Sequence, residues 1–190
     1  MPAPYWAITS VCWMVFWVYW SFGARQRRPS RRKAARTFSV LNTGLLYLGF
    51  LLVLLGRSVP GSLGLLVVPQ TIPMDVAGTG FAILGVAFAI LSRQFLGNNW
   101  SGEVAIAEGQ QLIRRGPYAI VRHPIYTGML LALFGTTLVA STVGSLLGFV
   151  LAILSLWQKA HIEEQFLMVE FGEQYARYQR EVKFLIPLFY

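Results

Sequence analysis

Residues 125–157 read IYTGMLLALFGTTLVA-ST-VGSLLGFVLAILSLW, and this stretch decides the fold. It holds two uncharged apolar runs, Ile125–Ala140 and Val143–Trp157, with only Ser141 and Thr142 between them. At about 1.5 Å per helical residue, each run reaches about 22 to 24 Å, less than the ~30 Å hydrocarbon core of a bilayer. We therefore expect two membrane-embedded helices that are joined as a tight helical hairpin.

Three more apolar segments precede this hairpin: Tyr5–Phe22, Phe38–Gly56 and Met74–Ser92. Each has 18 or 19 residues, close to the ~20 of a transmembrane helix, and Asp75 is the only charge among them. The prediction is an all-α fold, a polytopic membrane bundle of five transmembrane helices in a single domain, residues 1–190. The first three helices lie in residues 1–92, and the polar motifs lie in residues 93–190.

The composition agrees with a membrane protein. Apolar types make up 55% of the 190 residues and charged types 13%, about half the charged share of an ordinary soluble domain. A chain with so few charges lacks the side chains to cover a water-exposed surface. The single cysteine, Cys12, excludes an intramolecular disulfide framework and a cysteine-based metal site.

The distribution of positive charge predicts the topology. Loop 23–37 carries seven Lys or Arg residues and no acid, so it belongs on the cytoplasmic side. Five crossings then place the N-terminus outside and the C-terminus inside, with 15 of the 16 Lys and Arg residues in the cytoplasm. The basic cluster follows the first apolar run, which is typical of an anchor and not of a cleaved signal. Because the loop has no aromatic residue, we expect it to contact membrane lipid and no nucleic acid.

The densest polar cluster is Arg122-His123-Pro124-Ile125-Tyr126, at the start of the fourth helix. Arg122 is a permanent cation, and His123 titrates near neutral pH. A helix that starts at Pro124 offers free N–H groups to an anion. A helix cap with a snorkelling arginine would use the same residue types, so the residues alone leave an anion site and a cap equally open.

The end of the fifth helix carries a second polar cluster: Lys159, His161, Glu163 and Glu164. The hairpin returns this end to the side of the first cluster, so we expect a glutamate to meet Arg122, its histidine neighbour or a cationic ligand. A purely structural ion pair is the alternative, because carboxylates beside a membrane are costly unless paired or hydrated. The spacing of these residues is not distinctive of a metal site, and we predict none.

Residues 165–182 read as an amphipathic helix that is broken near Gly172. It either lies on the membrane or folds over the polar clusters as a lid. The apolar segment 184–190 should dock on the bundle. The apolar stripe of the helix would comprise Phe166, Leu167, Val169, Tyr175, Tyr178 and Val182.

Glycine patterns in the apolar segments have structural interpretations. Residues 78–80 with Gly85 resemble part of a dinucleotide-binding pattern, but they lie in an apolar helix without a preceding strand. Gly144 and Gly148 form a small-xxx-small pattern. We interpret both as helix-packing features. Gly97, followed by two asparagines, predicts the C-terminal cap of the third helix.

Several motifs in residues 93–183 occur in the order and spacing of a known family. They are Leu96-Gly-Asn-Asn-Trp-Ser101, Gly116-Pro-Tyr118, Arg122-His-Pro-Ile-Tyr126, Glu163-Glu164 and Phe171-Gly-Glu-Gln-Tyr175-Ala-Arg-Tyr178. On these motifs the chain resembles prokaryotic members of the isoprenylcysteine carboxyl methyltransferase family, a group that also contains membrane phospholipid N-methyltransferases. The resemblance implies an integral membrane enzyme that transfers a methyl group from S-adenosylmethionine. The cofactor pocket would be cytoplasmic, with residues 93–190 as the catalytic half.

The resemblance also implies site residues. Glu163 would bind the ammonium or ribose of the cofactor, and His123 its polar end. The catalytic residues would be Arg122 and Lys159, which orient an anionic substrate, and Glu164. Lys159 stands where the family usually has arginine, so the positive charge is kept but the bidentate guanidinium donor is not. The cofactor-binding positions would be Gln110, Gln111, Leu112, Ile113, Tyr118, His123, Pro124, Ile125, Tyr126 and Glu163.

The expected methyl acceptor is lipophilic and enters from the bilayer, and no obligate protein partner is expected. A prenylcysteine-like carboxylate is ionised at neutral pH and needs no base, so carboxyl O-methylation is the predicted reaction. The main alternative is a phospholipid or small-amine N-methyltransferase, which would use Glu163, Glu164 or His123 as base. A nicotinamide-dependent membrane reductase and a non-catalytic membrane protein are less favoured.

Overall fold

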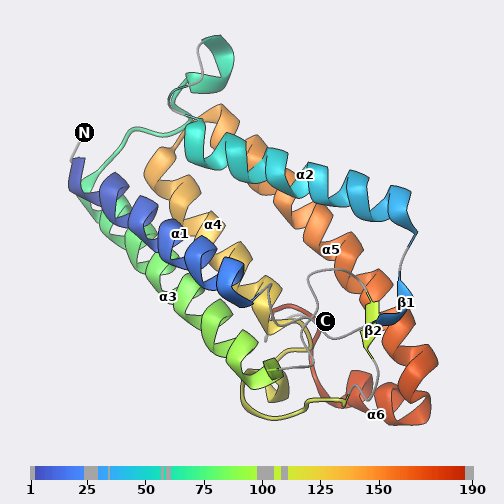
Figure 1. Ribbon diagram of the computed structural model, residues 1–190. Helices are drawn as coiled ribbons and strands as arrows, with labels where there is room; N and C mark the ends of the chain where they lie inside the picture. The colour runs from blue at the N-terminus through green and yellow to red at the C-terminus, as the bar shows by residue number, and fades with distance from the viewer. Residues whose placement is uncertain are drawn as a thin grey trace.

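The computed structural model describes residues 3–23, 30–33, 35–56, 58, 61–97, 105–107 and 111–186. These residues are mostly helical, as predicted (Figure 1). The α-helices are α1 (Ala3–Gly23), α2 (Arg36–Leu55), α3 (Ile72–Leu96), α4 (Pro124–Ala140), α5 (Val143–Phe171) and α6 (Glu173–Glu181). Shorter elements are the 3-10 helices η2 (Gly61–Gly64) and η4 (Gly116–Ala119) and the strands β1 (Ser30–Lys33) and β2 (Ala105–Ala107).

The helical architecture is as predicted, and two short strands that were not expected accompany it. β1 and β2 pair antiparallel, with Ser30 opposite Ala107 and Lys33 opposite Ala105. Part of the basic loop is therefore bound to the segment that follows α3. The pairing supplies hydrogen-bond partners to backbone N–H and C=O groups in both segments, a requirement that hydropathy does not reveal.

Three helices among the described residues are long and apolar enough to cross a membrane: α3, α5 and Thr37–Leu55 of α2. α4 is apolar but has 17 residues, and α1, with four tryptophans in 21 residues, is outside this set. The first four helices lie within four residues of their predicted bounds. Hydropathy thus located these four helices correctly.

Two helix pairs form the body of the molecule: α3 lies along α4, and α2 lies along α5 (Figure 1). Glycine makes both contacts close. A Cβ atom on Gly78 would lie 2.6 Å from the carbonyl oxygen of Gly135, and one on Gly49 would lie 2.7 Å from that of Gly148. The interpretation of these glycine patterns as packing features is confirmed, and Gly148 packs within the chain. Gly80, in contrast, has open space around it.

Aromatic side chains attach α1 to the other helices. Trp13 is 2% exposed, and its ring meets Phe50 of α2 edge-on, with 4.8 Å between centroids. The indole Nε1 of Trp13 donates a hydrogen bond of 2.9 Å to Thr136 Oγ1 on α4. This bond satisfies two polar groups in apolar surroundings, where an unpaired group is costly. α1 is therefore held by both apolar and polar contacts.

The turn between α4 and α5 uses a left-handed residue and a capping box. Ser141 has a φ of 52°, and Thr142 caps α5 by exchanging hydrogen bonds with Ser145. The two-residue connection is as predicted. Beyond the turn α4 packs mainly along α3, and α5 packs mainly along α2 (Figure 1). The main packing partner of α4 is therefore α3.

The fifth helix is longer than predicted. The apolar run ends at Trp157, but α5 continues to Phe171 and has 29 residues, about 43 Å in length. Residues 158–171 contain neither Gly nor Pro, so nothing stops the helix where the apolar run ends. Gly172, with a φ of 50°, ends α5 and starts α6, which confirms the predicted break. The separate helix expected from Gln165 is wrong in its first half.

Candidate functional site

The far end of α5 meets the segment that leads into α4. The Nε atom of Arg122 lies 2.6 Å from Glu164 Oε1, and His123 Nε2 lies 3.2 Å from the same oxygen. The predicted meeting of the two polar clusters is therefore confirmed. Arg122 and His123 lie 42 and 41 residues before Glu164 in the chain, and the continuous α5 carries the glutamates to this place.

Glu164 is enclosed by donors. Its second oxygen, Oε2, accepts a hydrogen bond of 2.9 Å from Gln179 Nε2 on α6. The side chain is only 12% exposed. With Arg122 and His123 on the first oxygen, both carboxylate oxygens have protein partners. The ion pair considered from the sequence as an alternative is thus present.

Arg122 holds the end of α6 as well as Glu164. Its Nη1 atom donates to the carbonyl oxygens of Gln179 and Val182, at 3.0 and 2.6 Å. The guanidinium also lies 5.4 Å from the ring centroid of Phe184. Arg122 was expected to orient an anionic substrate, but its Nε and Nη1 donors are engaged within the protein. A substrate contact through this residue stays a prediction.

Glu163 has a more open position than its neighbour. The hydroxyl of Tyr126 donates a 2.5 Å hydrogen bond to Glu163 Oε1, and His123 Nδ1 lies 3.6 Å from Oε2. The Glu163 side chain is 23% exposed, about twice the fraction of Glu164. Lys159 Nζ lies 5.7 Å from the centroid of the Tyr126 ring, one helical turn before Glu163. The tyrosine that holds the accessible carboxylate therefore also has a cation over its ring.

His123 lies between the two carboxylates. Its ring is parallel to that of Tyr126, with 5.7 Å between centroids, and Phe184 covers it edge-on at 5.2 Å. Burial alone would lower the pKa of His123, but the hydrogen bonds and charges of Glu163 and Glu164 outweigh it and raise the pKa above 6.5. The imidazole therefore keeps its second proton to higher pH than a free histidine.

Tyr118 depends on a glycine for its position. Gly116 has a φ of 60°, and a Cβ atom there would collide with the ring of Phe95. The 3-10 helix that follows buries Tyr118, which is 7% exposed. Burial first, and then the charge of Glu163, raise the pKa of Tyr118, so the phenol keeps its proton. The Gly-Pro-Tyr motif thus brings a neutral phenol into the electrostatic range of Glu163.

The last helix binds the same region. The Tyr178 hydroxyl donates a 2.6 Å hydrogen bond to the carbonyl oxygen of Tyr118. Arg114 pairs with Glu181 and lies 5.1 Å from the Tyr178 ring centroid. Of the two places predicted for this helix, these contacts support the one over the polar clusters. Tyr178 is buried as expected, whereas Val169 is 68% exposed and does not belong to the apolar stripe.

The residues that follow α6 form a strap, residues 182–186, across the start of α4. The backbone N–H groups of Arg122 and His123 donate to the carbonyl oxygens of Lys183 and Phe184, at 2.8 and 3.3 Å. Thr127 Oγ1 donates to the carbonyl oxygen of Leu185 at 2.6 Å. The predicted docking of the C-terminal segment is confirmed for these residues, and residues 187–190 lie outside the described part.

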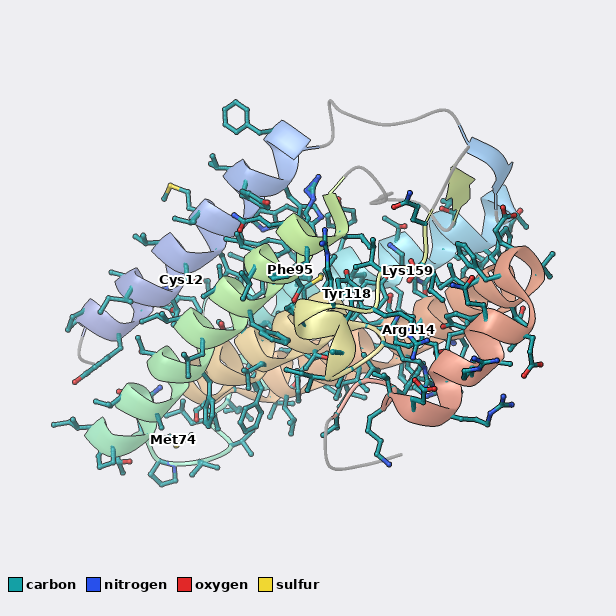
Figure 2. The ribbon with its side chains drawn as sticks, turned by 90° about the horizontal axis from the view of Figure 1, so that it is seen from below. Cys12, Met74, Phe95, Arg114, Tyr118 and Lys159 are labelled. Atoms are coloured by element: carbon teal, nitrogen blue, oxygen red, sulfur yellow. The ribbon has the colours of Figure 1, made fainter. Side chains whose placement is uncertain are left out.

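The remaining predicted site residues are distributed as follows. Pro124 and Ile125 are buried in the first turn of α4, with Pro124 at the predicted first position. Leu112 and Ile113 are half-buried, Gln111 is exposed, and Gln110 lies outside the described residues. Figure 2 shows that Arg114, Tyr118 and Lys159 lie well apart from Cys12 and Met74. Within the described ranges, no group of three His, Cys, Asp or Glu residues could hold a metal ion.

Sequence reasoning missed Gln179 and Arg114. Gln179 lies in a polar stretch that the sequence gives no reason to connect with Glu164. Arg114 is followed by Arg115, and nothing in the sequence indicates which of the two arginines contacts another element. Their roles depend on where α6 lies, which is a property of the tertiary structure.

The sequence pattern of the isoprenylcysteine carboxyl methyltransferase (ICMT) family matches residues 78–169. This range contains α4 and the part of α5 that carries both glutamates, so it covers the core of the polar site. Over residues 78–169 the chain is similar to the ICMT family. The ICMT match starts earlier than expected, within α3, and it ends before α6 and the strap.

The relatives that match part of this chain carry the names of two different methyltransferases. Methanethiol S-methyltransferases from Pseudomonas sp. strain GM41 and Pseudomonas deceptionensis are 41% and 39% identical over 70 residues, 37% of this chain and 26% of each relative. Protein-S-isoprenylcysteine O-methyltransferase from Schizosaccharomyces pombe is 31% identical over 120 residues, 60% of this chain and 50% of that protein. The chain spans between about a quarter and a half of the length of these relatives.

Proposed function

We propose that this chain is an integral membrane methyltransferase that uses S-adenosylmethionine. The observation that carries the proposal is the Glu163 carboxylate, partly exposed and held by Tyr126 and His123 within the ICMT-matched region. The residues fit the charges of this cofactor. A carboxylate suits its ammonium or its ribose hydroxyls, and a protonated imidazole suits its carboxylate. When bound, the cofactor supplies a methyl group that is already activated by the sulfonium.

The other residues would orient the reactants. Tyr118 and Tyr126 offer aromatic faces that attract a sulfonium cation. Lys159, beside the Tyr126 ring, is placed to orient an anionic acceptor. An in-line transfer needs alignment of the acceptor with the methyl group and exclusion of water, and the covering strap serves the second need. The remaining cofactor contacts would come from Gln110, Gln111, Leu112, Ile113, Pro124 and Ile125.

The acceptor that we favour is the carboxylate of a prenylcysteine-like or other lipophilic molecule. The name of the S. pombe relative supports this choice. So does the state of the possible bases. His123 holds its proton between two carboxylates, and Glu164 has both oxygens engaged. An acceptor that is already ionised fits such a site better than one that must lose a proton.

S-methylation of a thiol is the second candidate, because the Pseudomonas relatives are named methanethiol S-methyltransferases. A thiol has a pKa of about 8.5 and must lose its proton before it attacks. Glu163 is then the base that we would assign, since it is the more exposed carboxylate. An amine acceptor would need the same step.

We also propose that α1 to α5 all cross the membrane, with α4 and α5 as the last two spans. The N-terminus would lie outside, and the active site and C-terminus in the cytoplasm. In this arrangement 15 of the 16 Lys and Arg residues fall on the cytoplasmic side, in agreement with the usual excess of positive charge there. The length of α5, about 43 Å, lets it span the bilayer and still carry Glu163 beyond it. A lipophilic acceptor would then enter sideways from the bilayer.

The direct test supplies radiolabelled S-adenosylmethionine to the purified protein with one acceptor at a time: a farnesylated cysteine, a small thiol or an amino-phospholipid. We expect label in a base-labile methyl ester of the farnesylated cysteine. Label in a base-stable thioether or amine would replace the carboxyl acceptor by the second candidate or the amine. A folded protein that neither binds the cofactor nor labels any acceptor would contradict the methyltransferase proposal.

A further inference from the structure

The two neighbouring glutamates of α5 have unlike surroundings. Glu163 contacts the α4 side through Tyr126 and keeps part of its carboxylate accessible. Glu164 instead contacts three donors, Arg122, His123 and Gln179, and is the less exposed of the two. The pair therefore divides into one accessible carboxylate and one enclosed carboxylate.

We infer that Glu164 is a positioning residue, which holds His123 and α6 in place around Glu163 and touches neither methyl donor nor acceptor. The inference rests on the proposed function, because it assigns a role within the same site. It replaces the catalytic role that the resemblance implied for Glu164. It extends to α6, which lies outside the region matched by the ICMT family.

Glu164 connects three parts of the chain through one charge. It binds Arg122 directly, and Arg122 in turn donates to the carbonyl oxygens of Gln179 and Val182 at the end of α6. The side-chain amide of Gln179 donates to Glu164, so Glu164, Arg122 and Gln179 form a closed circuit of hydrogen bonds. Hydrogen bonds of this kind, with an ionised partner, are stronger and more directional than neutral ones. Loss of the negative charge would leave the Arg122 guanidinium without a carboxylate partner in this circuit.

The orientation of His123 depends on the same charge. The groups that face its ring are Glu163 and Glu164 from α5, Tyr126 from α4 and Phe184 from the strap, with Arg122 beside it in the chain. Glu164 makes the shorter of the two carboxylate contacts, 3.2 Å against 3.6 Å. The contact fixes the ring plane and so directs the other nitrogen toward Glu163. Without it, the accessible carboxylate loses a fixed neighbour.

The test uses the fact that the chain has two histidines. Imidazole NMR of the full-length protein in detergent gives two titrations, and His161→Gln assigns them. We expect Glu164→Gln to move the His123 titration to lower pH and to speed amide exchange in α6. Glu173→Gln is the matched control, because Glu173 makes an exposed ion pair with Arg180 at 2.8 Å. Glu173→Gln should change neither the His123 titration nor the amide exchange of α6. Glu164→Asp, which keeps the charge, should retain part of the wild-type behaviour in both.

The second readout is kinetic. Glu164→Gln should raise the KM for S-adenosylmethionine about tenfold, the effect of one hydrogen bond to a charged group, with kcat little changed. A fall in kcat at constant KM, or an unchanged His123 titration, would overturn the positioning role. If Glu164→Gln does not fold, Arg122→Lys tests the same circuit through α6 exchange, and unchanged exchange there overturns it equally. A wild-type protein that fails to bind S-adenosylmethionine would contradict the proposed function. The histidine titration needs no cofactor, so it would still test the positioning role of Glu164.

Discussion

The α3–α4 contact and the cluster around Glu164 hold helices together by opposite means. Between α3 and α4, glycines such as Gly78 and Gly135 bring two backbones into contact without any charge. Around Glu164, ionised side chains bridge α5, α6 and the segment before α4. In hydrocarbon no hydrophobic force joins helices, so close packing does it, whereas beside water directional charged bonds do. The first contact should therefore be sensitive to volume and the second to charge.

The largest effect is expected from volume in the helix contact. Gly78→Ala places a Cβ atom 2.6 Å from a backbone oxygen of α4, and backbone atoms cannot move aside cheaply. We expect a loss of about 3 kcal/mol in unfolding free energy, measured by denaturation in detergent micelles.

Gly80→Ala is the control two residues away on the same helix, with open space around its Cβ position. It should be neutral or slightly stabilising, because alanine is the better helix former. Equal losses in the two variants would refute the close-packing account of this contact.

The next effect is expected from charge in the Glu164 cluster. Arg122→Met keeps the length of the side chain but leaves Glu164 facing His123 and Gln179 alone. Removing one partner of a largely buried pair costs about 2 kcal/mol after allowance for its partial exposure. Thermal unfolding in detergent measures it. Arg180→Met removes an exposed partner and should cost little, so a similar loss there would mean that burial does not matter.

A smaller effect is expected from the polar bond inside the apolar body. Trp13→Phe removes the donor to Thr136 and keeps an aromatic ring against Phe50. The expected loss is about 1 kcal/mol, measured by the same unfolding experiment. Trp6→Phe, at the half-buried start of α1, is the comparison. A greater loss there would show that ring size, and not the hydrogen bond, governs the attachment of α1.

The smallest effect is expected from a change of pH. Burial lowers the pKa of His123 and so offsets part of the increase that the two carboxylates cause. The folded-state pKa of His123 is raised above 6.5, so its contribution to stability is complete below pH 6.5. It is lost as pH rises from 6.5 through the folded-state pKa. Unfolding midpoints measured across this window should fall in the wild type and stay flatter in His123→Gln. A midpoint that rises with pH in the wild type alone would contradict the assignment.

Much of this arrangement follows from the sequence. Hydropathy gave the positions of α1 to α4, because apolar runs of this length are stable as helices only in a bilayer or a core. The two-residue turn between α4 and α5 predicted that Arg122 and His123, just before α4, would meet the paired glutamates of α5. The glycine patterns followed from their place inside apolar helices.

Other features depend on information that local sequence does not hold. Hydropathy shows where a helix passes from apolar to polar surroundings, which is not where the helix ends. The continuation of α5 to Phe171 was therefore missed. The β1–β2 pair joins segments that have α2, η2 and α3 between them in the chain. The enclosure of Glu164 requires Gln179, whose partner is set by the place of α6. The difference between Glu163 and Glu164 is therefore a tertiary property of two identical adjacent residues.

The most direct test of the central claim, a cofactor site built on Glu163 and His123, is calorimetric titration of S-adenosylmethionine into the detergent-purified protein. The account predicts saturable binding by the wild type and by Glu173→Gln, and a loss of about tenfold or more in Glu163→Ala and His123→Ala. No binding by a folded, monodisperse wild type would contradict it, as would full affinity in Glu163→Ala.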